Sequence, residues 1–86
     1  MVVTLGGRVQ GVGFRSFARY KAILLGIKGY ARNTFDGRLE VTAEGPVEEL
    51  EEFLKELTKG PPSARVREVD VRFETATDEF YEFSIR

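Results

Sequence analysis

The chain has 86 residues, of which 42% are apolar and 31% charged, and its formal net charge is −1. A globular chain of this size buries roughly 60–65% of its unfolded surface, which is enough for one modest core. The near-neutral charge argues against electrostatically driven nucleic-acid binding, because that affinity depends on neutralising phosphates. The sequence has no cysteine and no histidine, which excludes disulfides, a thiol nucleophile, a histidine base and cysteine-based metal sites.

The first half of the chain predicts a strand, a helix and a β-hairpin. Alternating apolar residues predict a strand over residues 2–9. After a glycine-bearing segment the spacing becomes helical from about Arg15, and Gly26 suits the end of this helix. The apolar stripe expected to face the core consists of Phe17, Tyr20 and Leu24, with Ala18, Ala22 and Leu25 beside it. Residues 27–34 then alternate as a second strand, and Asp36-Gly37 is a hairpin turn signal before a third strand over 39–44.

The second half predicts a helix followed by two strands. Pro46 suits the first turn of the helix, and Lys59 and Gly60 close it before two prolines. Its expected core stripe consists of Val47, Leu50, Leu54 and Leu57, with Phe53 alongside. Strand-like alternation returns in Val69, Val71 and Phe73, and again in Tyr81, Phe83 and Ile85.

The predicted element order is β-α-β-β-α-β, followed by a short extra C-terminal strand. This order is typical of the α+β ferredoxin-like sandwich, in which two helices cover one face of an antiparallel sheet. Because the sequence contains no repeat, linker or low-complexity segment, we expect residues 1–86 to form a single domain.

The segment from Gly7 to Arg15 has the features of an anion site. A glycine-bearing loop between a strand and a helix can turn successive backbone N–H groups inward, and the helix N-terminus adds further donors. The planar guanidinium of Arg15 can hold two phosphate oxygens at once. The alternative is that Gly11 and Gly13 only allow a tight turn and that Arg15 is solvated. The Gly-x-Gly-x-x-Gly motif is absent, since Ser16 stands where its third glycine is required. A Walker loop is absent too, since the sequence has no Gly-Lys-Ser/Thr.

Two blocks of the sequence carry a family resemblance. Residues 7–15 read Gly-Arg-Val-Gln-Gly-Val-Gly-Phe-Arg and resemble the acylphosphatase signature Gly-Arg-Val-Gln-Gly-Val-x-Phe-Arg at every defined position. Residues 29–40 resemble the family's second block, Gly-x-Val-x-Asn-x-x-Asp-Gly-x-Val-Glu, with Ala31 and Leu39 in place of two valines. The similarity extends over essentially the whole chain.

The resemblance implies a hydrolase that cleaves the carboxyl–phosphate bond of acyl phosphates by direct water attack, without metal or cofactor. The family's catalytic arginine falls on Arg15 and its catalytic asparagine on Asn33. The loop whose backbone N–H groups bind the phosphate falls on Gln10, Gly11, Val12, Gly13 and Phe14.

The chemistry of these residues agrees with the resemblance. Phosphoryl transfer from an activated acyl phosphate chiefly requires electrostatic clamping and positioning. An asparagine has two donors and one acceptor and orients a water without titrating. Without the resemblance, Asn33 would be interpreted as a hairpin residue, and Asp36 and Gly37 are expected to be structural. Arg8, Arg32 and Arg38 are expected at the surface.

Two other functions share some of these features. An RNA-recognition module has the same element order, and Lys28 to Phe35 resembles the start of the RNP1 pattern. However, the match falls on the second strand instead of the third, and Arg32 and Asn33 stand where an aromatic and an aliphatic residue are required. The acylphosphatase-like domain of carbamoyl-transferring hydrogenase maturation proteins usually has proline at the position of Ser16.

The sequence also leads to expectations about partners and location. We expect a small-molecule acyl phosphate as substrate, inorganic phosphate as product and inhibitor, and a monomer that binds neither nucleic acid nor membrane. The apolar segment at the N-terminus is too short for a signal peptide, because a charged residue, Arg8, already interrupts it. No apolar run in the sequence approaches the length of a membrane span. A cytoplasmic location is therefore expected.

Overall fold

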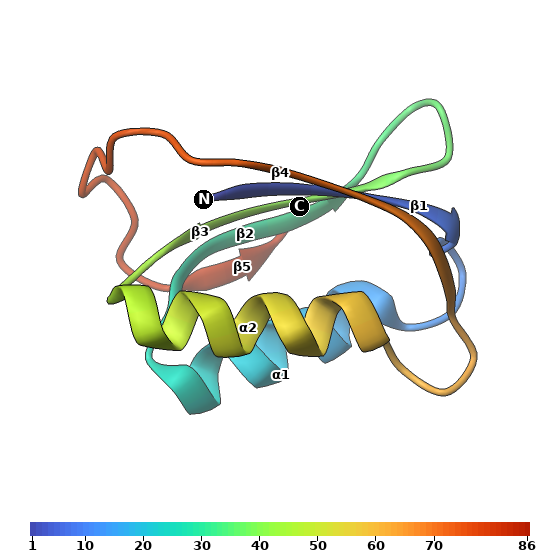
Figure 1. Cartoon of the computed structure of the whole chain (residues 1–86), viewed down its shortest axis with the longest axis horizontal. Helices are drawn as coiled ribbons and strands as arrows, with labels where there is room; N and C mark the ends of the chain where they lie inside the picture. The colour runs from blue at the N-terminus through green and yellow to red at the C-terminus, as the bar shows by residue number, and fades with distance from the viewer.

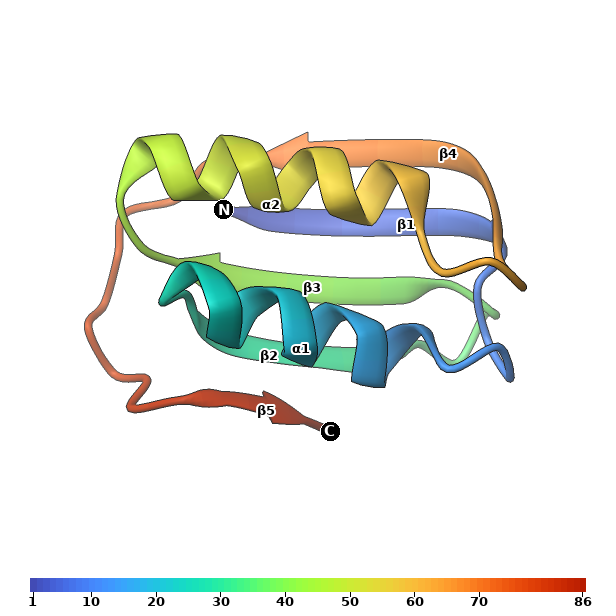
Figure 2. The same ribbon diagram turned by 90° about the horizontal axis from the view of Figure 1, so that it is seen from below.

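Two helices pack on one face of a five-stranded sheet in the computed structural model, which describes residues 1–86 (Figure 1). The elements in chain order are β1 (Val2–Arg8), α1 (Phe14–Leu25), β2 (Lys28–Asn33), β3 (Leu39–Glu44), α2 (Val47–Lys59), β4 (Arg65–Arg72) and β5 (Phe83–Ile85). The strands lie in the order β4-β1-β3-β2-β5, as Figure 2 shows with the helices in front of the sheet. The predicted ferredoxin-like arrangement is confirmed.

The terminal strand makes the sheet mixed. All neighbours among β4, β1, β3 and β2 are antiparallel, whereas β5 runs parallel to β2, with Gly29 opposite Phe83 and Ala31 opposite Ile85. The segment between β4 and β5 passes along one end of the sheet to the opposite edge (Figure 2). The connection is long because β4 and β5 lie at opposite edges of the sheet.

The buried face of α1 differs from the predicted stripe. Phe14, Ala18 and Ala22 are buried at i, i+4, i+8 spacing, while Tyr20 and Leu24 are 60% and 63% exposed. Both stripes have helical periodicity, so the spacing alone does not choose between them. Alanine on the inner face lets α1 lie close to the sheet, and this packing decides which stripe is buried.

The core side of α2 is closer to the prediction. Leu50, Phe53 and Leu57 are buried. The rings of Phe53 and Phe83 pack edge to face, with their centroids 5.8 Å apart. Val47 is 69% exposed, so its predicted place in the core is wrong. It is the first residue of the helix, directly after Pro46, and the first buried residue of the helix, Leu50, comes three positions later.

The edge strand β4 contains an irregularity that the alternation did not predict. The pairing register between β1 and β4 shifts between Gly6 and Gly7, so that Val66 and Val71 both pack against the core despite an odd spacing. A side chain at Gly7 would place its Cβ only 2.2 Å from the backbone oxygen of Arg65. Phe73 lies beyond the strand and is 75% exposed, contrary to the prediction.

Candidate active site

Three segments that carry the predicted site residues meet at one end of the sheet. The loop after β1, the start of α1 and the end of β2 lie together there, as both ribbon views show. A cavity of about 110 Å³ opens between them. Its lining residues are Val9, Gly11, Gly13, Phe14, Arg15, Ser16, Asn33 and Ile85. The structure therefore brings Arg15 and Asn33, 18 positions apart in the chain, to one small cavity.

The loop before α1 has the backbone geometry of an anion nest. Gly11 and Gly13 have φ values of 71° and 75°, in the left-handed region, and a Cβ at either position would meet no atom within 4 Å. Conformation, and not lack of space, is therefore the reason for glycine at both positions. Left-handed residues of this kind turn neighbouring N–H groups toward one side of the chain.

The N-terminus of α1 is open. Gly13 occupies the capping position with no side-chain hydrogen bond, and the first turn contains no acidic residue. The first N–H groups of a helix have no partner within the helix, and they carry the positive end of its dipole. This end of α1 can therefore accept an anion in the cavity.

Arg15 is the second residue of α1 and is half-buried. Its Nη1 donates a hydrogen bond to the backbone oxygen of Arg86 at 3.2 Å. One turn later, Arg19 donates from Nε to the backbone oxygen of Phe83, also at 3.2 Å. Arg19 thus serves to hold β5 and does not line the cavity, so Arg15 is the arginine that the fold places there.

Asn33 is the last residue of β2 and lies opposite Leu39 on β3. It is half-buried and borders the cavity. It shares the face of β2 on which Gly29 and Ala31 are buried beneath the helices, as the alternation predicted. This face places Asn33 on the same side of the sheet as the loop and α1.

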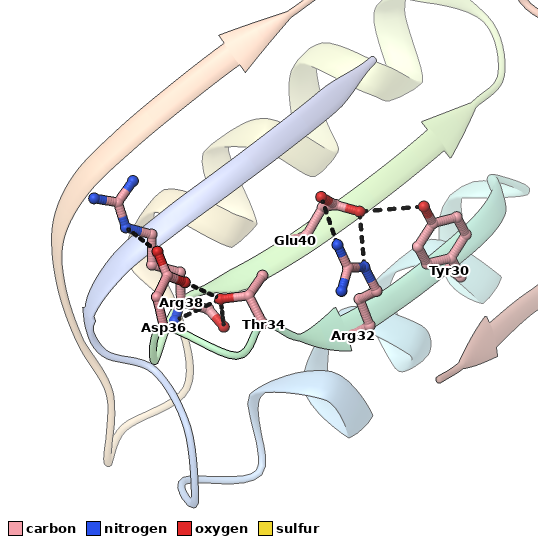
Figure 3. Close-up of polar contacts among 6 residues, drawn as sticks. All are labelled: Tyr30, Arg32, Thr34, Asp36, Arg38 and Glu40. Atoms are coloured by element: carbon pink, nitrogen blue, oxygen red, sulfur yellow. Dashed lines mark hydrogen bonds and ion pairs between the residues drawn. The ribbon is translucent and has the colours of Figure 1, made fainter.

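The connection between β2 and β3 is a tight hairpin whose neck is closed by hydrogen bonds. Thr34 N donates to the backbone oxygen of Arg38 at 2.8 Å, and Arg38 N donates to Thr34 Oγ1 at 2.9 Å. The Thr34 hydroxyl also donates to the Asp36 carboxylate (Figure 3), and this bond lowers the pKa of Asp36. Gly37 has a φ of 91°, so Asp36 and Gly37 have the turn geometry expected of them.

Two of the predicted loop residues do not line the cavity. Val12 packs against the hydrophobic core. Gln10 turns its side chain toward the hairpin, where Nε2 donates to the backbone oxygens of Thr34 and Arg38, each at 2.9 Å. Ile85 and Ser16, in contrast, line the cavity without having been predicted. Ile85 reaches it only because β5 pairs with β2, and no local pattern indicates that pairing.

The opposite face of the sheet holds a separate polar cluster, drawn in Figure 3. Arg32 donates from Nε and Nη2 to the two carboxylate oxygens of Glu40, at 2.9 and 3.1 Å, and the Tyr30 hydroxyl donates to Glu40 at 3.2 Å. The hydrogen bond from Arg32 is the main reason why the pKa of Glu40 is lowered. As predicted, Arg32 points away from Asn33.

A larger cavity of about 310 Å³ lies on this second face, under the segment that leads to β5. Four acidic side chains line it, and three of them are engaged with other residues. Glu40 binds Arg32, and Glu44 accepts hydrogen bonds from the backbone and hydroxyl of Thr77. Glu74 pairs with Arg72. It contains neither Arg15 nor Asn33. The smaller cavity at the end of the sheet is therefore the better candidate for anion chemistry.

Comparison with known proteins identifies the family. Residues 1–85 match the family model described as Acylphosphatase. The chain belongs to the acylphosphatase family. The acylphosphatase of Thermus thermophilus is 56% identical over 73 residues, covering 85% of this chain and 83% of that protein. The acylphosphatase of Salinibacter ruber is 46% identical over 80 residues, covering 93% and 84%.

Solved structures agree with the family assignment. The crystal structure of acylphosphatase from Bacillus subtilis superimposes with a TM-score of 0.95 at 35% identity, covering 99% of this chain and 94% of that one. A full-length HypF structure, in a phosphate- and nucleotide-bound form, matches 99% of this chain with a TM-score of 0.88 at 35% identity, but this is only 11% of its own length.

Family and fold together make this chain an enzyme of the acylphosphatase class and support hydrolysis of acyl phosphates as its function. They favour this activity over the RNA-binding alternative. No helix in the structure is both long and apolar enough to cross a membrane.

Proposed function

We propose that this chain hydrolyses acyl phosphates to a carboxylate and inorganic phosphate by direct attack of a water molecule on phosphorus. The observation that carries the proposal is the shared cavity at the end of the sheet, bordered by Arg15, Asn33 and the open N-terminus of α1. The cavity is small and is lined in part by the polar side chains of Arg15, Ser16 and Asn33, which suits a phosphoryl group, while the acyl group extends outward.

The phosphoryl group is held by backbone and guanidinium donors together. The N–H groups of the loop from Gln10 to Phe14 and the first turn of α1 bind its oxygens, and Arg15 adds a charged, planar donor. Charge in a phosphoryl-transfer transition state is spread over three oxygens of the transferred group. Fixed donors aimed at those oxygens stabilise it without reorganisation. This loop therefore acts as a phosphate-binding loop.

The nucleophile is a water molecule oriented by Asn33. The amide has an acceptor for a water hydrogen and donors for a water oxygen. The leaving carboxylate is a weak base, so departure of the acyl group needs no strong acid. This accounts for a site that contains neither histidine nor a carboxylate among its lining residues.

The test is a phosphate-release assay with an aromatic acyl phosphate, run beside an aryl phosphate monoester. We expect turnover of the acyl phosphate alone, and competitive inhibition by inorganic phosphate. Equal turnover of the monoester would show a general phosphatase, and no turnover of either substrate would refute the proposal.

We also propose that residues 1–86 act as one domain and as a cytoplasmic monomer that binds no nucleic acid. The net charge of −1 supports the last point, and a chain without cysteine is compatible with a reducing compartment. Light scattering of the eluting peak in size-exclusion chromatography measures the oligomeric state, and a mass above that of one chain would contradict a monomer.

A further inference from the structure

The side chain of Gln10 joins the loop before α1 to the hairpin that follows Asn33. Its Nε2 donates one hydrogen bond to the backbone oxygen of Thr34 and one to that of Arg38, both at 2.9 Å. Since both acceptors are carbonyl oxygens, only the NH₂ end of the amide can face them. The contact therefore uses both amide donors of Gln10.

These two carbonyls stand on opposite sides of the hairpin neck. Thr34 directly follows Asn33, and Arg38 directly precedes Leu39, the residue paired with Asn33. The two sides are joined by the 2.8 Å bond from Thr34 N to the Arg38 oxygen. One side chain from the loop thus holds both sides of the neck next to Asn33.

The hydrogen bonds that close the hairpin neck lie within the hairpin and do not connect it to the loop before α1. The hairpin residues from Phe35 to Arg38 are exposed, and the side chain of Phe35 at the tip is fully exposed. The β2–β3 ladder ends at the pair formed by Asn33 and Leu39. Beyond that pair, the contact from Gln10 links the hairpin to the loop.

We infer that Gln10 is a positioning residue for hydrolysis: its amide sets the distance between the loop that binds the phosphoryl group and Asn33, which orients the water. The inference rests on the proposed function. The family resemblance gives Gln10 a role only through its backbone N–H, and the inference adds a role for its side chain. Misplacing a reactant by ~1 Å can slow a reaction by about 10², so a rigid link between these two parts has a direct effect on rate.

The test begins with Gln10→Met, which keeps the length of the side chain and removes both donors without adding charge. We expect kcat to fall about tenfold, whereas the inhibition constant of inorganic phosphate changes less than about threefold, because Arg15 and the loop N–H groups remain. Phe35→Ala, at the tip of the same hairpin, is the matched control and should keep the parent rate. Circular dichroism and chemical denaturation of both variants establish that they are folded at the assay temperature.

The variant Gln10→Glu adds a second test, in which kcat is measured as a function of pH. An ionised carboxylate has no donor and repels both carbonyls, whereas a protonated carboxyl donates one bond. The neighbouring carbonyls raise the pKa of the introduced carboxyl, because they disfavour its charged form. We therefore expect kcat relative to the parent to rise as the pH is lowered through that pKa, and Gln10→Met to show no such rise.

A double-mutant cycle with Asn33→Ala decides whether Gln10 acts through Asn33. In the Asn33→Ala background, Gln10→Met should lower kcat by less than about twofold, because no oriented water remains to be misplaced. Three results would overturn this inference and leave the proposed function intact, provided that Asn33→Ala is slow. They are a normal rate for Gln10→Met, a double variant whose loss is the full product of the two single losses, and a loss in Phe35→Ala equal to that in Gln10→Met. A normal rate for Asn33→Ala itself refutes the water-orienting role in the proposed function, and this inference with it.

Discussion

Arg15 and Arg86, 71 positions apart in the chain, are joined by a hydrogen bond of 3.2 Å from the guanidinium Nη1 to the backbone oxygen. Arg86 is itself held on β2, since its N–H donates to the backbone oxygen of Ala31 at 2.9 Å and its guanidinium lies 4.0 Å from the centre of the Tyr30 ring. The strand added to the ferredoxin-like sheet therefore supports the side chain proposed to hold the phosphoryl group.

Replacement of Arg15 tests this side chain directly. Arg15→Ala should lower kcat/KM by about 10²–10³, the usual cost of losing one donor to a developing charge, and should weaken inhibition by inorganic phosphate. Arg15→Lys should restore little, because an ammonium does not make the bidentate contact. Steady-state kinetics with phosphate as inhibitor measures both effects.

Arg19→Ala is the control for the Arg15 variants, since Arg19 lies one turn further along α1 and its bond goes to the backbone of Phe83. It should cost some stability while the folded enzyme keeps its rate within a few-fold. Near-parent activity in Arg15→Ala, or an equal loss in Arg19→Ala, would mean that Arg15 does not hold the phosphoryl group.

Replacement of Asn33 tests whether this residue acts in the mechanism or only shapes the hairpin. If Asn33 positions the water, Asn33→Ala should lower kcat by about 10² or more and leave phosphate inhibition nearly unchanged. Asn33→Asp should be at least as damaging and should also weaken binding, because it places negative charge beside an anionic substrate. The variants are compared by kcat, KM and phosphate inhibition, with folding checked by circular dichroism. A folded Asn33→Ala enzyme at the parent rate would contradict the water-positioning role.

The activity should not depend on a metal ion. No group of three or more histidine, cysteine, aspartate or glutamate side chains in this structure could hold one, and donors supplied by Arg15 and the loop can neutralise the phosphoryl charge instead. After exhaustive dialysis against a chelator, the rate should equal that of the untreated enzyme. Loss of activity that only added Mg²⁺ restores would refute this prediction.

Two glycines with positive φ should differ sharply in their tolerance of a side chain. Gly29 has a φ of 142°, and an added Cβ would lie 1.8 Å from the backbone oxygen of Thr42, whereas Gly26 has a φ of 69° and nothing within 4 Å. Gly26→Ala should cost only about 1–2 kcal/mol of conformational strain. Gly29→Ala should cost more than ~4 kcal/mol or prevent folding, because the sheet must separate locally. Urea denaturation compares the two, and equal losses would contradict the clash at Gly29.

The Arg32–Glu40 pair should make part of the stability depend on pH. The hydrogen bond from Arg32 lowers the pKa of Glu40 below its usual 4.5, so the folded state is stabilised above pH 4.5 and loses this contribution as the pH falls through the lowered pKa. Glu40→Gln should therefore cost about 1 kcal/mol at pH 7 and less at pH 3. Chemical denaturation at both pH values measures the difference.

The activity of Glu40→Gln at pH 7 serves as its control, because Glu40 lies on the face of the sheet opposite Asn33 and should not affect the rate. An equal loss of stability at pH 7 and pH 3 would contradict the electrostatic origin of the effect.

The sequence by itself determined the features that depend on neighbouring residues. Left-handed glycine at Gly26 ends α1, and Asp36-Gly37 turns the β2–β3 hairpin, because their backbone preferences act within a few positions. Helix and strand periodicity then predicted the order of the elements, and that order is nearly sufficient for the ferredoxin-like arrangement. The same periodicity put Asn33 on the helix-covered face, which is why it borders the cavity.

The tertiary structure alone decided the contacts between segments far apart in the chain. Periodicity offered α1 two apolar stripes, and only packing against the sheet buried Ala18 and Ala22 in preference to Tyr20. The parallel pairing of β5, the bond from Arg15 to Arg86 and the contact from Gln10 to the hairpin neck have no local signal. Each of these contacts joins a donor and a backbone oxygen from segments far apart in the chain. Only the packing of the folded sheet brings such groups within hydrogen-bond distance.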